Sequence, residues 1–245
     1  MIKLNRNFTP IFFNPQNVSV LTAKFANNNK ARVWHHYDVR EACMTLSTNK
    51  CAYCEVMLDQ KSTYMEVEHF KHKDAYPNEV IKWTNLLPSC RHCNGSKGDH
   101  DVVKEPIVNP CIDNPPDHFE MTGYRLIPKT PLGEMSIEVL NLNDVKHYVI
   151  PRCGIGSILS DNIELAQKYF QEYIANRNTK NKRKVVNLIR AILVQCQSDA
   201  LFAAVSASVL HENRLYKKLV PDLMSQGLWA SDLKLLHDNS LILCL

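Results

Sequence analysis

The chain has little glycine and no long apolar run, and each shortage excludes a class of protein. Seven glycines among 245 residues exclude a collagen-like or glycine-rich fibrous chain. The N-terminus, M-I-K-L-N-R-N-F-T-P, lacks the sustained apolar segment of an export signal. A membrane span needs about 20 predominantly apolar residues, whereas the most apolar stretch, residues 188–210, is interrupted by Arg190, Gln195, Gln197 and Asp199. We therefore expect a globular, cytoplasmic protein without a membrane anchor.

The charge balance is also modest. The chain has 29 basic and 25 acidic residues, a formal excess of +4 that is compatible with nucleic acid but does not by itself indicate it. No glycine-rich Walker-type phosphate loop is present, so any dependence on ATP must come from a partner. One basic run without acidic members predicts either a solvated helix junction or a phosphate-contacting patch: Arg177, Lys180, Lys182, Arg183 and Lys184.

Cysteine is plentiful, and its spacing indicates a metal site. The nine cysteines are an odd number in a long chain, which argues against a secreted disulfide scaffold. Four of them form two Cys-x-x-Cys pairs, Cys51/Cys54 and Cys90/Cys93, and four thiolates make a closed tetrahedral site typical of structural zinc. Free buried thiols and redox pairs are the alternatives. Buried thiols are also our interpretation of the other five: Cys43, Cys111, Cys153, Cys196 and Cys244.

Turn residues and apolar periodicity divide the chain into four regions. Residues 1–49 predict an extended arm (1–15) and two helices within 18–46, broken near residues 27–29. Residues 50–110 hold the cysteine pairs. Residues 111–160 form a turn-rich connector, in which runs 124–127 and 136–140 predict a β-hairpin and residues 141–144 a helix cap.

Residues 161–245 predict a helical region. Asp161 is expected to cap a first helix, and further helices are expected at about 182–195 and 198–210. Pro221 is expected to start or interrupt the next element and Gly227 to end it. The apolar tail, residues 241–245, is expected to dock onto the body of the protein or onto a partner.

The 35 residues between the cysteine pairs exceed the ~15–20 of a simple zinc ribbon, so a sizeable unit must be folded there. T-Y-M-E-V-E-H-F (63–70) alternates as a strand, with Glu66 and Glu68 on one face, and the strand must end or bulge for His69 to join them. W-T-N-L-L (83–87) predicts a second strand, which Pro88 ends, and Ser89 predicts the cap of a following helix. We expect an α+β protein, with a zinc-pinned ββα core embedded in a mainly α-helical chain.

This pattern resembles the HNH endonucleases of the ββα-metal fold. The likeness covers residues 51–99, with E-H ending the first strand, N-L-L on the second and C-x-x-C-N-x-x-K-G on the helix. More narrowly, C-A-Y-C-E, V-E-H-F and W-x-N-L-L-x-S-C-x-x-C-N-x-x-K-G-D resemble the PtuB-like HNH effectors of Septu and retron antiphage systems. The opening I-K-L-N-R and the later G-Y-R-L and E-V-L-N-L-N extend that likeness loosely over much of the chain.

The resemblance implies a metal-dependent nuclease. His69 would be the general base, since a neutral imidazole with a pKa of about 6.5 can take a proton from water near pH 7. Glu68 and Asn94 would bind Mg²⁺ or Mn²⁺ through oxygen, with Asn94 standing where the family pattern has a final histidine.

Three more residues take supporting roles in this scheme. Asn85 would fix the loop and orient the base, and Glu66 would either support the ligands or add one to them. Lys97, one helical turn from Asn94, would neutralise phosphate charge.

The resemblance also implies partners. PtuB-like nucleases work with an ABC-type ATPase (PtuA-like), and retron systems add a reverse transcriptase with RNA-linked DNA that holds the nuclease in check. DNA is the favoured substrate, and RNA such as tRNA is compatible with the same chemistry.

The alternative is a non-catalytic, zinc-stabilised nucleic-acid-binding or adaptor module, although such a module has no use for Glu68 beside His69. For His35 and His36, surface or capping roles are favoured over metal ligation, and His92 is expected to be exposed. For His72, a surface role and a substrate-loop role stay open.

Overall fold

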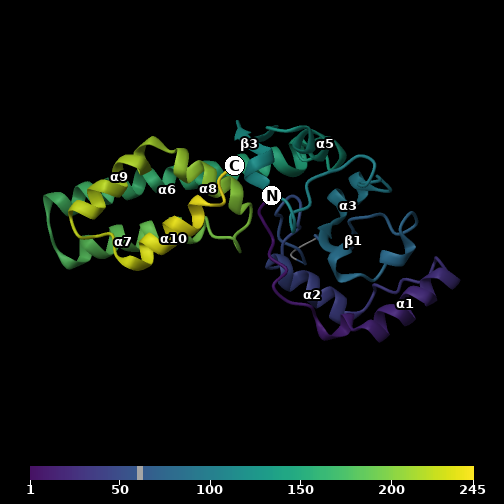
Figure 1. The fold of residues 1–245 in the computed structure, drawn as a ribbon. Helices are drawn as coiled ribbons and strands as arrows, with labels where there is room; N and C mark the ends of the chain where they lie inside the picture. The colour runs from purple at the N-terminus through teal and green to yellow at the C-terminus, as the bar shows by residue number, and fades with distance from the viewer. Residues whose placement is uncertain (60–62) are drawn as a thin grey trace. The chain divides into compact units, whose positions relative to one another are not determined.

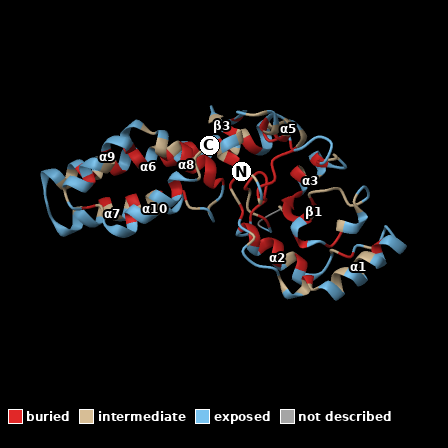
Figure 2. Ribbon diagram, viewed as in Figure 1, coloured by how far each residue is buried: buried red, intermediate tan, exposed pale blue. Residues whose placement is uncertain are grey.

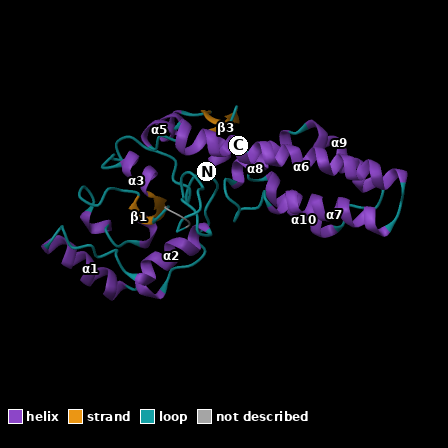
Figure 3. Cartoon of the chain, turned by 180° about the vertical axis from the view of Figure 1, so that it is seen from behind, coloured by secondary structure: helices purple, strands orange, loops and turns teal. Residues whose placement is uncertain are grey.

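The computed structural model describes residues 1–59 and 63–245, which form two compact units (Figure 1). The first unit comprises residues 1–120 and 126–143, and the second comprises residues 121–125 and 144–245. The named strands form two small two-stranded sheets, β1–β2 and β3–β4, while helices make up most of the fold (Figure 3). The expected α+β class is therefore confirmed. No helix in the described part of the chain is long and apolar enough to cross a membrane.

The N-terminal arm is part of the first unit and packs through the buried side chains of Met1, Ile2 and Leu4. It ends in a 3₁₀ turn, Ile11–Phe13, before helices α1 (Pro15–Asn27) and α2 (Tyr37–Ser47). The second helix begins later than its apolar pattern suggested, because the ring of His36 caps it by accepting a hydrogen bond from the Asp38 N–H. Residues 28–36 are left as an irregular segment between the two helices.

The expected ββα unit is present, with shifted boundaries. Strand β1 (Met65–His69) pairs antiparallel with β2 (Leu86–Cys90), and α3 (Arg91–Lys97) follows at once. The prediction of a strand at 83–87 was wrong, because Trp83–Asn85 forms a 3₁₀ turn. Pro88 does not end the strand. A two-stranded sheet leaves one side of β2 unpaired by β1, so a residue without an N–H is tolerated there.

The helix cap also differs from the prediction. The side chain of Cys90, rather than that of Ser89, accepts the hydrogen bond from the N–H of Cys93. One cysteine therefore ends the strand, caps the helix and joins the cysteine cluster.

The hairpin expected from runs 124–127 and 136–140 was also wrong. Strand β3 (Phe119–Thr122) pairs with β4 (Arg125–Pro128) through a turn in which Gly123 and Tyr124 both have positive φ, 55° and 62°. A short helix α4 (Pro115–His118) precedes this hairpin, and α5 (Pro131–Val139) follows it. The α5 helix forms because Pro131 occupies its first turn and the Thr130 hydroxyl accepts a hydrogen bond from Gly133.

The second unit is a bundle of five helices within the described residues: α6 (Ile150–Ala175), α7 (Thr179–Val194), α8 (Ala203–Glu212), α9 (Arg214–Ser225) and α10 (Ser231–Leu241). Their buried residues lie on the inward faces (Figure 2). As predicted, Asp144 is a cap, here of the π-helical turn Val145–Val149 that leads into α6. The prediction that Asp161 starts a helix was wrong, because α6 begins with Pro151 in its first turn and runs through Asp161.

Pro221 neither starts nor breaks a helix but lies inside α9, whose buried residues Tyr216, Leu219 and Leu223 continue across it. Gly227 ends α9 as expected, with φ +64° and a pair of backbone hydrogen bonds typical of a helix terminus. The C-terminal tail docks onto its own unit, since the Leu245 N–H donates to Ser208 Oγ at 2.9 Å.

Candidate active site

The two cysteine pairs converge on one buried cluster. Cys51, Cys54, Cys90 and Cys93 place their sulfur atoms within 4.8 Å of one another, and the Sγ atoms of Cys54 and Cys90 are 3.7 Å apart. Zn–S bonds of about 2.3 Å in a tetrahedron require sulfurs about 3.8 Å apart. Burial raises the pKa of the Cys54 and Cys93 thiols, whereas hydrogen bonds with the other three cysteines lower the pKa of Cys90. Four thiolates held this close together repel one another and need a cation among them. The cluster therefore fits a four-thiolate metal ion.

His69 ends β1 and is almost completely buried, with 6 % of its surface exposed. Its Nε2 lies 2.9 Å from the carbonyl oxygen of Val80. A carbonyl only accepts, so Nε2 carries the proton and Nδ1 keeps a free lone pair. Burial lowers the pKa of His69 to about 4, so the ring is neutral at pH 7.

Two neighbours hold this ring in place. Trp34 packs edge-to-face on it, with ring centroids 4.7 Å apart. Asn85 fixes the loop that supplies Val80: its Oδ1 accepts from the Lys71 N–H at 2.7 Å, and its Nδ2 donates to the carbonyls of Lys71 and Glu79. The geometry agrees with the loop-fixing role expected for Asn85.

Glu68 lies on the same strand, with 3 % of its surface exposed. Burial raises its pKa to about 7, and the nearby ammonium of Lys97, 2.7 Å away, opposes that rise. Lys97 also donates to the backbone oxygen of His69 at 3.0 Å. Because Lys97 is itself buried, the expected contact of its ammonium with phosphate does not fit the structure. Lys97 instead ties α3 to the end of β1.

Glu66 and Asn94 form a second polar pair. Asn94 Nδ2 donates to Glu66 Oε2 at 2.6 Å, which fixes the amide so that its Oδ1 is left as an acceptor. For Glu68 and His69 to serve one site, the strand was expected to end or bulge at His69. Strand β1 does end at His69. Glu66, Glu68 and Asn94 all border one cavity, and carboxylate and amide oxygens are the donor type that Mg²⁺ and Mn²⁺ prefer.

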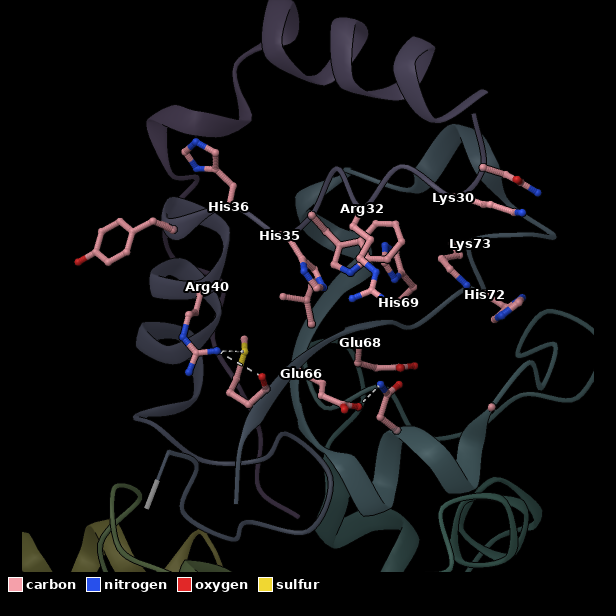
Figure 4. Close-up of a pocket in the computed structure, with 17 residues that line it drawn as sticks. Lys30, Arg32, His35, His36, Arg40, Glu66, Glu68, His69, His72 and Lys73 are labelled. Atoms are coloured by element: carbon pink, nitrogen blue, oxygen red, sulfur yellow. Dashed lines mark hydrogen bonds between the residues drawn. The ribbon is translucent and has the colours of Figure 1, made fainter. Parts of the chain in front are cut away.

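That cavity has a volume of about 1070 Å³ (Figure 4). Its lining residues come from the segment between α1 and α2, from α2, from β1 and the loop after it, and from α3 and its C-terminal end. The acidic residues Glu66 and Glu68 lie on β1, next to Asn94 of α3. Basic residues and histidines line the remaining wall: Lys30, Arg32, His35, His36, Arg40, His72 and Lys73. The arrangement combines a place for a cation with a surface for an anion.

The sequence reasoning missed most of this wall. Lys30 and Arg32 lie in N-N-N-K-A-R-V-W-H-H, where two cations shortly precede a tryptophan, a signal that was available. His36 has the capping role expected of it, and both His35 and His36 border the cavity. His72 also lines the cavity and lies 3.7 Å from Asp74. His92 was expected to be exposed but is half-buried.

The basic run, for which a solvated helix junction and a phosphate-contacting patch were both open, belongs to the second unit. Arg177 precedes α7, and Lys180, Lys182, Arg183 and Lys184 lie in the helix. Lys184 pairs with Glu172 at 3.2 Å and lies 5.0 Å from the centre of the Tyr169 ring. The ammonium group of Lys184 therefore has partners within its own unit.

No family model matches the chain, but three curated proteins are similar to it. The Septu protein PtuB of Bacillus thuringiensis is 38 % identical over 222 residues, which cover 90 % of this chain and 86 % of that protein. The Septu protein PtuB of Bacillus mycoides (strain KBAB4) is 30 % identical over 138 residues, 43 % of this chain and 46 % of that protein. YoqL, an SPbeta prophage-derived protein of Bacillus subtilis (strain 168) named as a candidate HNH endonuclease, is 33 % identical over 78 residues, 28 % of this chain and 31 % of that protein.

Proposed function

The chain belongs to the Septu PtuB family, and from that premise we propose that it is a divalent-metal-dependent HNH endonuclease that hydrolyses phosphodiester bonds in nucleic acid. The observation that carries the proposal is the tautomer of His69. Its Nε2–H is engaged by Val80, its Nδ1 is unprotonated at neutral pH, and it borders the same cavity as Glu66, Glu68 and Asn94. A neutral ring with one free nitrogen is what a general base requires.

In the proposed reaction, Nδ1 of His69 accepts a proton from water as the water oxygen bonds to phosphorus. The bond from phosphorus to the 3′ oxygen breaks, and that oxygen takes a proton from solvent. The products carry a 5′-phosphate and a 3′-hydroxyl. A Mg²⁺ or Mn²⁺ ion held by Glu68 and Asn94 would stabilise negative charge on the phosphate and the leaving oxygen. Glu66 would keep the Asn94 oxygen oriented toward that ion.

We assign zinc to the four-cysteine cluster, with a structural task. A closed thiolate site leaves no position for substrate or water, so it contributes shape and not chemistry. Asn94 follows Cys93 directly, and Cys90 caps the helix that carries both residues. Zinc would thus fix the position of an oxygen ligand of the second metal.

The biological setting follows from the family. We propose that the chain is the toxic effector of a Septu or retron antiphage system, restrained by an ABC-type ATPase and, in the retron case, by a reverse transcriptase with its RNA-linked DNA. We propose that it acts in the cytoplasm. DNA is the favoured substrate, and structured RNA such as tRNA offers the same phosphodiester to the site.

The test is cleavage of labelled duplex DNA, single-stranded DNA and tRNA by the zinc-loaded chain, alone and with its partners, in Mg²⁺ and in EDTA. His69→Ala is expected to abolish cleavage and leave binding intact. The control is His147→Ala, because His147 is a partly exposed histidine that does not border the cavity. Metal-independent cutting, or full activity of His69→Ala, would refute the proposal. Binding without cleavage in every condition would favour the non-catalytic module instead.

A further inference from the structure

Segment 28–36, which precedes the ββα core, forms one wall of the cavity and carries Lys30 and Arg32. We propose that Lys30 and Arg32 bind the phosphodiester backbone of the substrate strand. The proposal rests on the nuclease function argued above and adds to it the residues that hold the strand against the site.

The first argument is that these two cations have no competing task. Other basic residues of the cavity have acidic neighbours: Arg40 pairs with Asp59, and Lys73 lies 3.3 Å from Asp74. Across residues 1–59 and 63–245, by contrast, neither Lys30 nor Arg32 has a carboxylate within 4 Å of its charged nitrogens. Both are exposed.

The second argument concerns the acids on the opposite side of the cavity. If Lys30 and Arg32 balanced those charges, no external anion would be needed. Glu68, however, is already paired with Lys97 at 2.7 Å. Among the described residues, Glu66 forms no ion pair with Lys30 or Arg32, and its Oε2 instead accepts a hydrogen bond from the neutral amide of Asn94. The positive charge on the wall is therefore available to an anion that enters the cavity.

The third argument is that the wall is ordered. Val33 is buried, and Trp34 packs against Phe25 of α1 at 6.0 Å and against His69 at 4.7 Å. Across these two residues, the His35 N–H donates to the carbonyl of Arg32 at 2.9 Å. Val33 and Trp34 fix the segment that carries the two cations, and Trp34 joins that segment to the candidate base. Figure 4 shows Lys30 and Arg32 on this segment.

The size of the cavity favours a polymer. At about 1070 Å³ it lies at the upper limit of small-molecule sites, which span about 300–1,000 Å³. A nucleic-acid strand has several phosphates in a row. One phosphate can lie at the candidate metal-binding residues while a neighbouring phosphate contacts Lys30 and Arg32.

The test measures binding by catalytically inactive protein, so that cleavage does not interfere. In the full-length His69→Ala background, fluorescence anisotropy would give Kd for labelled duplex DNA, single-stranded DNA and tRNA at several salt concentrations. Lys30→Ala and Arg32→Ala are each expected to weaken binding about 3- to 10-fold in low salt. Each should lower the slope of log Kd against log salt by about 0.7 on a single strand and about 0.9 on a duplex.

Two variants serve as controls. Lys104→Ala removes the same charge from a highly exposed side chain that does not border the cavity, and it is expected to change Kd less than twofold. Arg32→Lys keeps the charge and should keep most of the affinity and slope. The substrate that shows the largest loss in the Lys30→Ala/Arg32→Ala double variant identifies the strand type that lies along the wall.

Failure of this inference is distinguishable from failure of the nuclease proposal. If wild-type protein cuts in Mg²⁺ but the double variant binds all three substrates with unchanged affinity and slope, the inference is wrong and the function stands. If the double variant loses binding while wild-type protein never cuts, the inference stands and the nuclease proposal is wrong.

Discussion

Val80 and His69 are joined by a hydrogen bond of 2.9 Å between a backbone oxygen and Nε2, although they lie eleven residues apart on either side of a loop. This bond fixes both the orientation and the tautomer of the ring. The loop is not held by the strands alone, because Asn85 contributes three hydrogen bonds to its backbone. The state of the candidate base therefore depends on an asparagine that has no chemical role in the reaction.

Replacing Asn85 by alanine is expected to disorder this loop. Loss of three partly buried hydrogen bonds, at about 1 kcal/mol each, should lower the free energy of unfolding by about 2–3 kcal/mol. Cleavage should fall more than about tenfold, since Val80 no longer fixes His69. Asn114→Ala is the control, because the Asn114 amide makes an exposed hydrogen bond with Asp117. Urea unfolding and initial cleavage rates measure both effects, and normal cleavage by Asn85→Ala would contradict this role.

The buried neutral state of His69 predicts a dependence of stability on pH. Its pKa is about 4 in the folded protein against about 6.5 when unfolded, so the unfolded state binds more protons between those values. Stability should therefore fall as pH falls through this window, by about 2 kcal/mol between pH 7 and pH 5 from this group. Urea unfolding of wild type and His69→Gln at pH 7 and pH 5 isolates the contribution of His69 to this loss of stability. An equal loss in both proteins would contradict the prediction.

Lys97 is expected to set the pH at which the second metal binds. Its ammonium lowers the pKa of Glu68 from an even higher value, so Lys97→Met should raise that pKa above about 7. Because a protonated carboxyl is a poor ligand, Mg²⁺ binding and cleavage should then require more alkaline solution. Lys97→Arg should shift the profile less. Titration calorimetry with Mg²⁺ from pH 6 to 9 would measure the shift, provided that circular dichroism shows both variants folded.

The four-cysteine cluster predicts two stages of metal removal. Brief EDTA treatment should stop cleavage reversibly, whereas removal of zinc should unfold the ββα unit. Cys54→Ser should reduce zinc below about one per chain and lower Tm by more than about 5 °C. Cys153→Ser, an exposed cysteine outside the cluster, should change neither. Elemental analysis and thermal melting provide the measurements, and a zinc-free, stable wild-type protein would refute the assignment.

Trp34 is expected to position His69 without taking part in the reaction itself. The edge-to-face contact should contribute about 0.5–1.5 kcal/mol. Trp34→Leu should therefore lower kcat about 3- to 10-fold with a smaller change in KM, and Trp34→Phe should recover much of the loss. A change confined to KM would show that Trp34 acts on binding instead.

Local sequence patterns were informative wherever chemistry and spacing act over a few residues. The Cys-x-x-Cys pairs, the alternation of Glu66 and Glu68, and the end of the strand at His69 were all readable, because ligand type and strand period leave few alternatives. Local patterns failed where packing competes with propensity. Runs 124–127 and 136–140 looked like two strands, but Pro131 and the Thr130 cap made the second a helix.

The sequence by itself determined the cysteine cluster, the ββα order and the family, since those depend on residue type and order along the chain. Only the tertiary structure decided what each polar group does. It withdrew Lys97 from phosphate by burying it against Glu68, gave His69 its tautomer through Val80, and brought Lys30 and Arg32 to the cavity. The physical reason is that burial and proximity set charge states and partners, and residues distant in the sequence come together only when the chain is folded.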